Sequence, residues 1–124
     1  MTLFPTKNKP PSEKSIMLGI ASALGYRGWL CLRVPPSIYS AKGWCDLIAV
    51  KWGMTVYIEC KSEKGKLSQD QRHFGDLITQ AGGLYIVAKS VEWAVQCLDA
   101  IEIEFDGMTL KPCKGMRLVV DGEN

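Results

Sequence analysis

Two short apolar segments on either side of Trp52-Gly53 constrain the fold of this chain more than any other feature. Residues 46–50 carry the run Leu-Ile-Ala-Val, and residues 54–60 carry the run Val-Tyr-Ile. Trp52-Gly53 has the composition of a tight turn, so the two segments are predicted to form a β-hairpin. Both runs are apolar on both faces, which is typical of central strands covered by helices. The chain is therefore expected to build a covered sheet around this hairpin.

Helical spacing of apolar residues predicts three helices around the sheet. The first runs from Ser12, an N-cap, to Leu24. Ser68 begins the second, with Gln71 at the capping-box position. Its apolar stripe is His73, Phe74, Leu77, Ile78 and Ala81. Ser90 begins the third, whose stripe is Trp93, Ala94, Cys97 and Leu98. Further strands are expected at 29–34 and 84–88, the latter parallel to its neighbour through a helical crossover.

The resulting order is α-β-β-β-α-β-α in an α/β fold, a mixed sheet flanked by helices. Asp106-Gly107 is a hairpin signal, so residues 101–105 and 108–110 are predicted to form a short C-terminal β-hairpin, with a further strand at 117–120. Prolines in residues 1–11 indicate a flexible arm. We therefore expect an arm at 1–11, a core at 12–98 and a β extension of the same domain at 99–124.

Polar residues occupy the outer ends of the central hairpin, where apolar residues would be expected. If the turn centres on Trp52-Gly53, Asp46 faces Glu59 directly, and Lys61 shares the face of Glu59. Two facing carboxylates repel each other unless a cation lies between them. Oxygen ligands suit Mg²⁺ or Mn²⁺, and Glu13 in the first turn of the first helix is a further carboxylate within possible reach. Lys61 is suited to offset charge on a phosphoryl group.

Each of these residues also has an ordinary structural explanation. A Glu-x-Lys pair is most often an exposed ion pair. Asp46 alone would serve as an edge charge that prevents aggregation. Glu13 alone would favour the helix dipole, and Gln71 alone would complete a cap. The combination and order of these residues, rather than any one of them, favour a catalytic site.

Residues 43–92 resemble the VRR-NUC domain, the virus-type replication-repair nuclease branch of the PD-(D/E)XK superfamily, in a stand-alone phage-like form. The resemblance rests on Gly-x-x-Asp, the hairpin, Glu-x-Lys, a Gly-Lys-Leu-Ser loop and Asp-Gln on the following helix, and it covers about residues 12–98. It implies a restriction-endonuclease-like core and a Mg²⁺- or Mn²⁺-dependent deoxyribonuclease that hydrolyses phosphodiester bonds. Cys45 stands where many members have proline, which affects only local rigidity.

The resemblance also implies the roles of individual residues. Asp46, Glu59, Lys61 and Gln71 would be catalytic. The metal ligands would be Glu13, Asp46, Glu59 and the backbone carbonyl of Cys60. Stand-alone relatives in viruses and phages act as homodimers, some on four-way junctions. A homodimeric, structure-selective endonuclease acting on branched DNA is therefore expected, with the C-terminal hairpin and Trp44, Trp52 or Trp93 as candidates for the interface.

The distribution of charge agrees with a polyanionic partner. Residues 1–66 carry ten Lys or Arg against four Asp or Glu, whereas residues 67–124 carry five against nine. A solvated charged surface would explain this asymmetry equally well. The candidate DNA contacts are Arg33, Lys42, Lys51, Lys64, Lys66 and Arg72, with Lys7 and Lys9 in the arm. No helix-turn-helix or zinc-finger pattern is present, so contacts to phosphates rather than bases are expected.

The sequence limits the compartment and the remaining chemistry. Apolar runs are far shorter than the ~20 residues that span a bilayer, and no signal peptide is apparent, so no membrane partner and a cytoplasmic location are expected, the host cytoplasm if the source is viral. Five cysteines are expected to be buried thiols, and with a single histidine a zinc site is not expected.

Four other functions remain open at this level. The chain could be a sequence-tolerant nickase or flap nuclease, or a restriction-type enzyme with sequence specificity. It could also be a DNA-binding module with a degenerate nuclease fold. A non-enzymatic assembly protein, in which the carboxylates form structural ion pairs, is the fourth interpretation.

Overall fold

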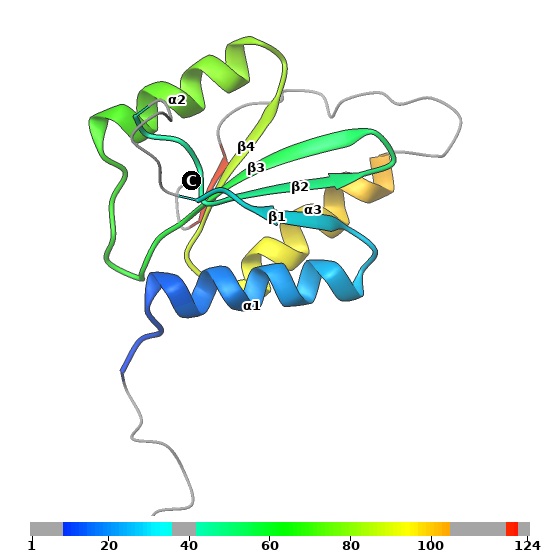
Figure 1. The fold of residues 1–124 in the computed structure, drawn as a ribbon, viewed down its shortest axis with the longest axis horizontal. Helices are drawn as coiled ribbons and strands as arrows, with labels where there is room; N and C mark the ends of the chain where they lie inside the picture. The colour runs from blue at the N-terminus through cyan, green and yellow to red at the C-terminus, as the bar shows by residue number, and fades with distance from the viewer. Residues whose placement is uncertain (1–8, 36–41, 105–118, 122–124) are drawn as a thin grey trace, which may run out of the picture.

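A five-stranded mixed sheet forms the centre of the molecule (Figure 1). The computed structural model describes residues 9–35, 42–104 and 119–121. The strands are β1 (Leu30–Arg33), β2 (Leu47–Lys51), β3 (Met54–Cys60), β4 (Leu84–Ala88) and β5 (Val119–Val120), and they lie in this order across the sheet. β1, β2 and β3 are antiparallel neighbours, whereas β4 and β5 run parallel to β3. The α/β class and the mixed sheet predicted from the sequence are confirmed.

The β2–β3 hairpin has the predicted turn and register. Trp52 and Gly53 both adopt positive φ, 53° and 78°, as a two-residue type I′ turn requires. Lys51 pairs with Met54, and Leu47 pairs with Ile58. Continuing this register by one residue places Asp46 opposite Glu59, at the end of the hairpin farthest from the turn.

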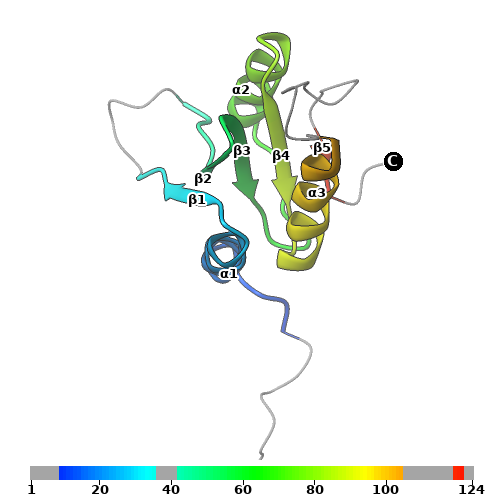
Figure 2. The same ribbon diagram turned by 90° about the vertical axis from the view of Figure 1, so that its right-hand side faces the viewer.

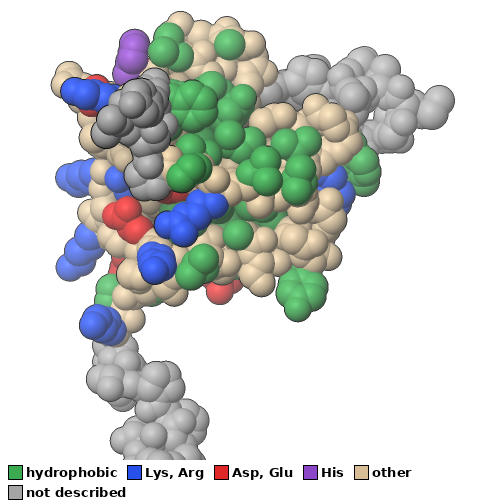
Figure 3. Space-filling view, in the orientation of Figure 1, with side chains coloured by type: hydrophobic (Ala, Val, Ile, Leu, Met, Phe, Trp, Pro, Cys, Tyr) green, Lys and Arg blue, Asp and Glu red, His purple; other side chains and the backbone are tan. Residues whose placement is uncertain are grey.

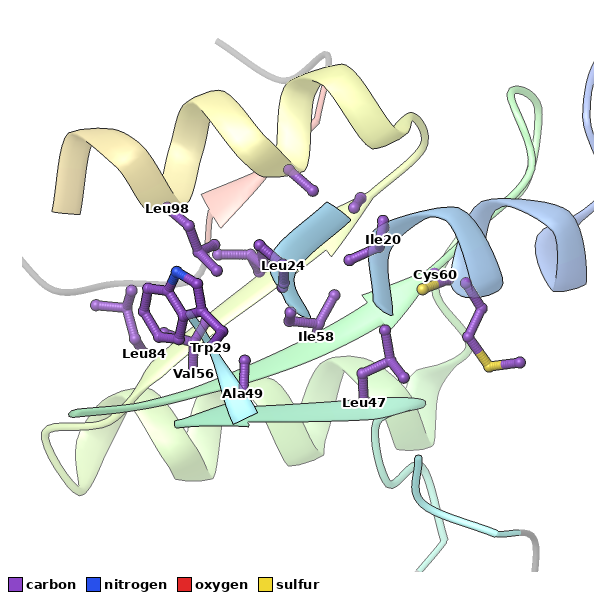
Figure 4. Close-up of a cluster of buried hydrophobic side chains, with 14 of the residues drawn as sticks. Ile20, Leu24, Trp29, Leu47, Ala49, Val56, Ile58, Cys60, Leu84 and Leu98 are labelled. Atoms are coloured by element: carbon purple, nitrogen blue, oxygen red, sulfur yellow. The ribbon is translucent and has the colours of Figure 1, made fainter. Parts of the chain in front are cut away.

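Two helices cover one face of the sheet and enclose the main core (Figures 1, 2 and 4). These are α1 (Glu13–Tyr26) and α3 (Val91–Glu104), which pack against each other and against the strands. Alternate residues of β2 and β3 point into this layer and are fully buried. The labelled core side chains in Figure 4 include Ile20, Leu24, Trp29, Leu47, Ala49, Val56, Ile58 and Leu98.

The third helix, α2 (Gln69–Gln80), covers part of the opposite face (Figure 2). Phe74 packs there with Cys45, Tyr85 and Val87 in a second, smaller cluster. The capping box is present as predicted: Ser68 Oγ accepts from the Gln71 N–H at 3.1 Å, and Gln71 Oε1 accepts from the Ser68 N–H at 2.9 Å. The cap fixes the start of α2 next to the ends of β3 and β4.

The sequence prediction of which α2 side chains are buried is wrong in part. Phe74 is buried and Ile78 packs against the second cluster, but His73, Leu77 and Ala81 are exposed. The helix packs mainly against β4 and lies away from β1, so fewer of its side chains are buried than its spacing indicates.

The sequence prediction is also wrong at the C-terminal side of the core. Residues 101–104 are helical, not the start of a hairpin, because Ile101 lies one turn beyond Leu98 and continues the buried stripe of α3. The remainder of the predicted hairpin, 105–110, lies outside the described residues, as do residues 1–8 of the predicted arm. The strand expected at 117–120 is confirmed for Val119–Val120.

α1 ends two residues later than predicted, at Tyr26. Within the described part of the chain, no helix has the length and apolarity needed to cross a bilayer.

Candidate active site

Asp46 and Glu59 meet at the outer end of the β2–β3 hairpin, as the register predicts. Asp46 precedes β2, and its Oδ2 accepts a hydrogen bond from the Cys60 N–H at 2.8 Å. Glu59 is the penultimate residue of β3 and is 2% exposed, the only buried charged side chain among the described residues. The backbone carbonyl of Cys60 belongs to the last residue of the same strand. A buried carboxylate beside a second carboxylate is costly to hold and is uncommon outside functional sites.

Two further predicted residues contact Glu59. Gln71 Nε2 donates to Glu59 Oε2 at 2.9 Å, so this side chain caps α2 and binds the carboxylate at once. Lys61 Nζ lies 3.8 Å from the same oxygen, and its side chain is only 11% exposed. The other oxygen, Glu59 Oε1, is buried and accepts no hydrogen bond. The carboxylate therefore has one satisfied oxygen and one oxygen without a donor.

The surroundings of Glu59 favour its protonated form when no cation is present. Burial raises the pKa of Glu59 most, and the negative charge of Asp46 raises it further. Lys61 opposes these effects, but the result is a pKa of about 8. The closeness of the Asp46 side chain thus favours a proton on Glu59. Because Glu59 and Asp46 are costly to ionise together in this site, a bound cation would stabilise the site strongly.

Glu13 lies at the rim of the site and not within the Asp46–Glu59 pair. It is exposed in the first turn of α1, and with Arg33 and Asp46 it lines a hollow of about 200 Å³. Its charge contributes weakly to the raised pKa of Glu59. Across the described ranges, no three acidic, histidine or cysteine side chains converge closely enough to form a complete metal cage. The structure thus joins Asp46, Glu59, Lys61 and Gln71 and leaves Glu13 across the hollow.

Gly43 and Cys45 explain why the segment before Asp46 takes its path. Gly43 has φ +83°, and a side chain there would collide with the backbone carbonyl of Asp70 in the first turn of α2. Cys45 is buried in the second cluster, and its thiol donates to the Leu47 carbonyl at 3.3 Å. The loop is therefore pressed against the helix that carries Gln71, which aligns Asp46 with Glu59.

The predicted DNA contacts separate into two groups. Arg33, Lys42, Lys64, Lys66 and Arg72 are exposed at or near the end of the sheet that holds the acidic pair. Lys51 lies at the opposite end of the hairpin, where its ammonium donates to the Arg27 carbonyl and lies over the rings of Trp29 and Trp52. Lys51 therefore lies apart from the acidic pair, and its contact with DNA stays a prediction. Figure 3 shows Lys and Arg side chains gathered near the start of α1 and the loop after β3.

Lys89 is a basic residue that the sequence analysis missed. It directly follows β4 and lines a second hollow with Lys66 and Arg72. Lys61 and Lys89 follow neighbouring parallel strands, and the Lys61 N–H donates to the Ala88 carbonyl at 3.0 Å. The carboxyl ends of parallel strands meet at one edge of a sheet, and this rule could have found Lys89.

Comparisons with known proteins place the chain among nucleases. A profile of the family described as "Archaeal holliday junction resolvase (hjc)" matches residues 18–108. The chain belongs to this family. A solved structure of a "VRR_NUC domain" has a TM-score of 0.61 and 16% sequence identity to this chain, and the alignment covers 72% of this chain and 97% of that one. A search of curated protein sequences found no significant match.

The resolvase family and the VRR-NUC domain both belong to the PD-(D/E)XK nuclease superfamily, so the fold and superfamily expected from the sequence are confirmed. The fold and family are those of DNA-cleaving hydrolases. The profile spans Asp46, Glu59, Lys61 and Gln71 but begins after Glu13. The expected role of Glu13 as a metal ligand is therefore supported only by its position at the rim of the hollow.

The residues of the site fit a divalent cation. PD-(D/E)XK nucleases generally use such ions. Glu59 Oε1 is a buried acceptor without a donor, and Asp46 supplies a second carboxylate beside it. The carboxylates of Asp46 and Glu59 and the Cys60 carbonyl are oxygen donors, which suits hard cations such as Mg²⁺ or Mn²⁺.

Proposed function

We propose that this protein is a metal-dependent endonuclease that hydrolyses phosphodiester bonds in four-way DNA junctions or other branched DNA. The observation that carries the proposal is the buried Glu59, held between Asp46, Lys61 and Gln71 with one oxygen lacking a donor. Buried acceptors are normally paired, so an unsatisfied oxygen on this carboxylate favours a bound cation over a structural ion pair. The resolvase family supports the choice of substrate.

Asp46, Glu59 and the Cys60 carbonyl would hold Mg²⁺ or Mn²⁺, with Glu13 bound directly or through water across the hollow. When bound, such an ion neutralises charge on the scissile phosphate and acidifies a water molecule. Glu59 must be ionised to bind it, and Gln71 favours this form by donating to Oε2. Gln71 therefore prepares Glu59 for its role as a ligand.

Lys61 is the cationic member of the site. Its ammonium lies 3.8 Å from Glu59 and is largely shielded from water, so its field is weakly screened. In the proposed reaction it orients the attacking water and offsets the negative charge that develops on the phosphoryl oxygens. Arg33 and Lys14 on the wall of the hollow add positive charge where a DNA backbone would approach.

The active form is proposed to be a homodimer. Leu30 and Leu32 on β1 are 58% and 49% exposed, and they share a face with Ile48 and Tyr57, which are only partly buried against the second cluster. Figure 3 shows hydrophobic side chains gathered over this part of the sheet. An apolar surface of this kind on an edge strand suits self-association. A twofold axis would hold two active sites at a fixed separation, as paired incisions require.

The candidate interface tryptophans differ in their surroundings. Trp44 is 40% exposed and packs on Phe74, with ring centroids 5.2 Å apart. Trp52 is 58% exposed at the hairpin turn, whereas Trp93 packs against the main core. Trp44 lies on the α2 face of the sheet and agrees best with the proposed interface.

The test is cleavage of labelled duplex, flap, splayed-arm and four-way-junction DNA of matched sequence with Mn²⁺ or with EDTA. The expected result is symmetric incision of the junction with Mn²⁺, no cleavage in EDTA, and no cleavage by Asp46→Ala or Lys61→Ala. Circular dichroism should show that both variants remain folded. Wild-type rates from Lys61→Ala would overturn the site assignment. Equal cleavage of flap and junction would replace junction selectivity with a sequence-tolerant nickase or flap nuclease.

A further inference from the structure

A second hollow lies beside the acidic site, on the α2 face of the sheet. Its volume is about 300 Å³, and it is lined by the basic residues Lys66, Arg72 and Lys89 and by the apolar residues Leu67, Val87 and Val120. These residues come from the loop before α2, the first turn of α2, and the ends of β4 and β5. The sequence does not place them together, because Val120 and Lys66 are more than fifty residues apart.

The strand register fixes the position of this hollow relative to Glu59. Glu59 pairs with Val87 across β3 and β4, and Val87 pairs with Val120 across β4 and β5. Paired residues of neighbouring strands point to the same face, and neighbouring strands are about 4.8 Å apart. The floor of the hollow therefore lies about 5 to 10 Å from Glu59, which corresponds to roughly one to three nucleotides at a rise of about 3.4 Å each.

The lining favours an anion with an apolar side. Three cationic side chains surround the hollow, and of the described residues that line it none is acidic. The N-terminal end of α2, with Arg72 in its first turn, adds the positive end of a helix dipole. The carboxylate of Asp121, which follows Val120, accepts a hydrogen bond from the Lys89 N–H at 3.0 Å. Leu67, Val87 and Val120 provide a floor for a sugar or the edge of a base.

The size of the hollow agrees with this chemistry. Its volume equals that of about ten molecules of liquid water, more than a lone phosphate needs. A phosphate with its attached sugar would place charge on the Lys66–Arg72–Lys89 rim and carbon atoms on the valine floor. A nucleotide of a DNA strand satisfies both parts of the lining.

We infer that this hollow, the flanking-phosphate pocket, binds one phosphate of the strand that is being cut, within one to three nucleotides of the scissile bond. The inference rests on the proposed function, because it assigns the occupant as DNA. The pocket holds the strand in register with Glu59 and Lys61, so it sets which bond is cut relative to the branch point. Lys89 is the residue that distinguishes the pocket from the general basic surface.

Methylphosphonate scanning tests the pocket one phosphate at a time. Junctions in which a single phosphate near the cut is replaced by an uncharged methylphosphonate are measured for binding to wild-type protein in EDTA by fluorescence anisotropy, and for cleavage with Mn²⁺. Methylphosphonate replacement at one position within three nucleotides of the cut should weaken binding by roughly tenfold. This is the loss expected for one charge-assisted contact. In Lys89→Ala, the same replacement should have little further effect, since the partner is already missing.

Lys64→Ala is the matched control, because Lys64 is exposed in the same loop region but does not line the pocket. It should weaken binding to every substrate alike and keep the position-dependent pattern of the wild type. A wild-type scan without a sensitive position, or equal sensitivity of Lys89→Ala and wild type, would overturn the pocket. Substrates that end at the sensitive position with or without a terminal phosphate distinguish an internal phosphodiester from a strand end. An effect seen only with the terminal phosphate would also overturn the inference as stated.

The binding measurement needs no catalysis, so the pocket and the proposed activity can fail separately. Loss of cleavage with an intact methylphosphonate pattern would reject the nuclease proposal and retain the pocket. Cleavage of junctions, together with a methylphosphonate scan that has no sensitive position, would reject the pocket and retain the nuclease proposal.

Discussion

Glu59 is the residue at which stability and the proposed activity oppose each other. The unfolded chain would release the proton of this carboxyl near pH 4.5, whereas the folded, metal-free protein keeps it until about pH 8. Between these values the unfolded state binds fewer protons, so the free energy of unfolding falls as the pH rises. The slope for one proton is at most about 1.4 kcal/mol per pH unit.

Thermal unfolding in EDTA should therefore give a larger decrease in Tm between pH 5 and pH 8 for the wild type than for Glu59→Gln. The amide removes the ionisation and still accepts from Gln71, so the variant should be the more stable protein at pH 8 and inactive in cleavage. Addition of Mn²⁺ should raise the Tm of the wild type only. Parallel Tm curves for the two proteins would contradict the raised pKa.

Gln71 performs two tasks that substitution can separate. Gln71→Glu keeps an acceptor for the Ser68 N–H, but it replaces the donor to Glu59 with a negative charge. Cleavage should fall by roughly tenfold to a hundredfold, the loss of a hydrogen bond to a charged group, while helix capping is retained. Ser68→Ala is the matched control: it should lower stability by about 1 kcal/mol and leave most of the cleavage rate. Similar rates for Gln71→Glu and wild type would remove Gln71 from the site.

At the scale of elements, the contact between the loop before β2 and the start of α2 aligns the two halves of the site. Gly43→Ala would combine a strained positive φ with a collision against the Asp70 carbonyl. Gly82→Ala shares the positive φ, +88°, but meets nothing within 4 Å. Gly82→Ala should lose about 1 to 2 kcal/mol of stability from backbone strain alone, and Gly43→Ala clearly more, with reduced cleavage. Denaturant titration measures both losses, and equal losses would show that the close contact has no energetic role.

The elements that could be predicted from sequence are those defined by local chemistry. Trp52-Gly53 sets the hairpin register, so the pairing of Asp46 with Glu59 follows by counting. The capping box of Ser68 and Gln71 is equally local. The continuation of α3 through Ile101 was missed because the hairpin signal of Asp106-Gly107 outweighed a buried stripe that only the packed core reveals.

The parts of the site that could not be predicted depend on tertiary placement. The contact of Gln71 with Glu59 requires that the helix start lies over the end of β3, which a capping pattern does not state. Glu13 is separated from Asp46 by 33 positions, and only the packing of α1 places it across the hollow. The contact of the Lys51 ammonium with the Arg27 carbonyl also depends on tertiary placement, because the two residues are far apart in the sequence.

For the whole molecule, the exposed apolar side chains of β1 lead to a prediction about assembly. Leu30 and Leu32 are exposed in a single chain, so replacing both with glutamate should leave the core intact. If this face forms the dimer, the negative charges will repel across the twofold axis, and sedimentation should show a monomer where the wild type is dimeric. Circular dichroism provides the control for folding.

The consequence for activity follows from the geometry of paired cuts. A dimer holds two acidic sites on one junction, so a single binding event can cut both strands. On a supercoiled plasmid carrying an extruded four-way junction, the wild type should produce linear DNA directly. The Leu30→Glu, Leu32→Glu variant should accumulate nicked circles, because each monomer cuts once and then dissociates. A monomeric variant that still linearises the plasmid without a nicked intermediate would separate paired incision from dimerisation, and it would place the coupling between the two cuts in the DNA rather than in the protein.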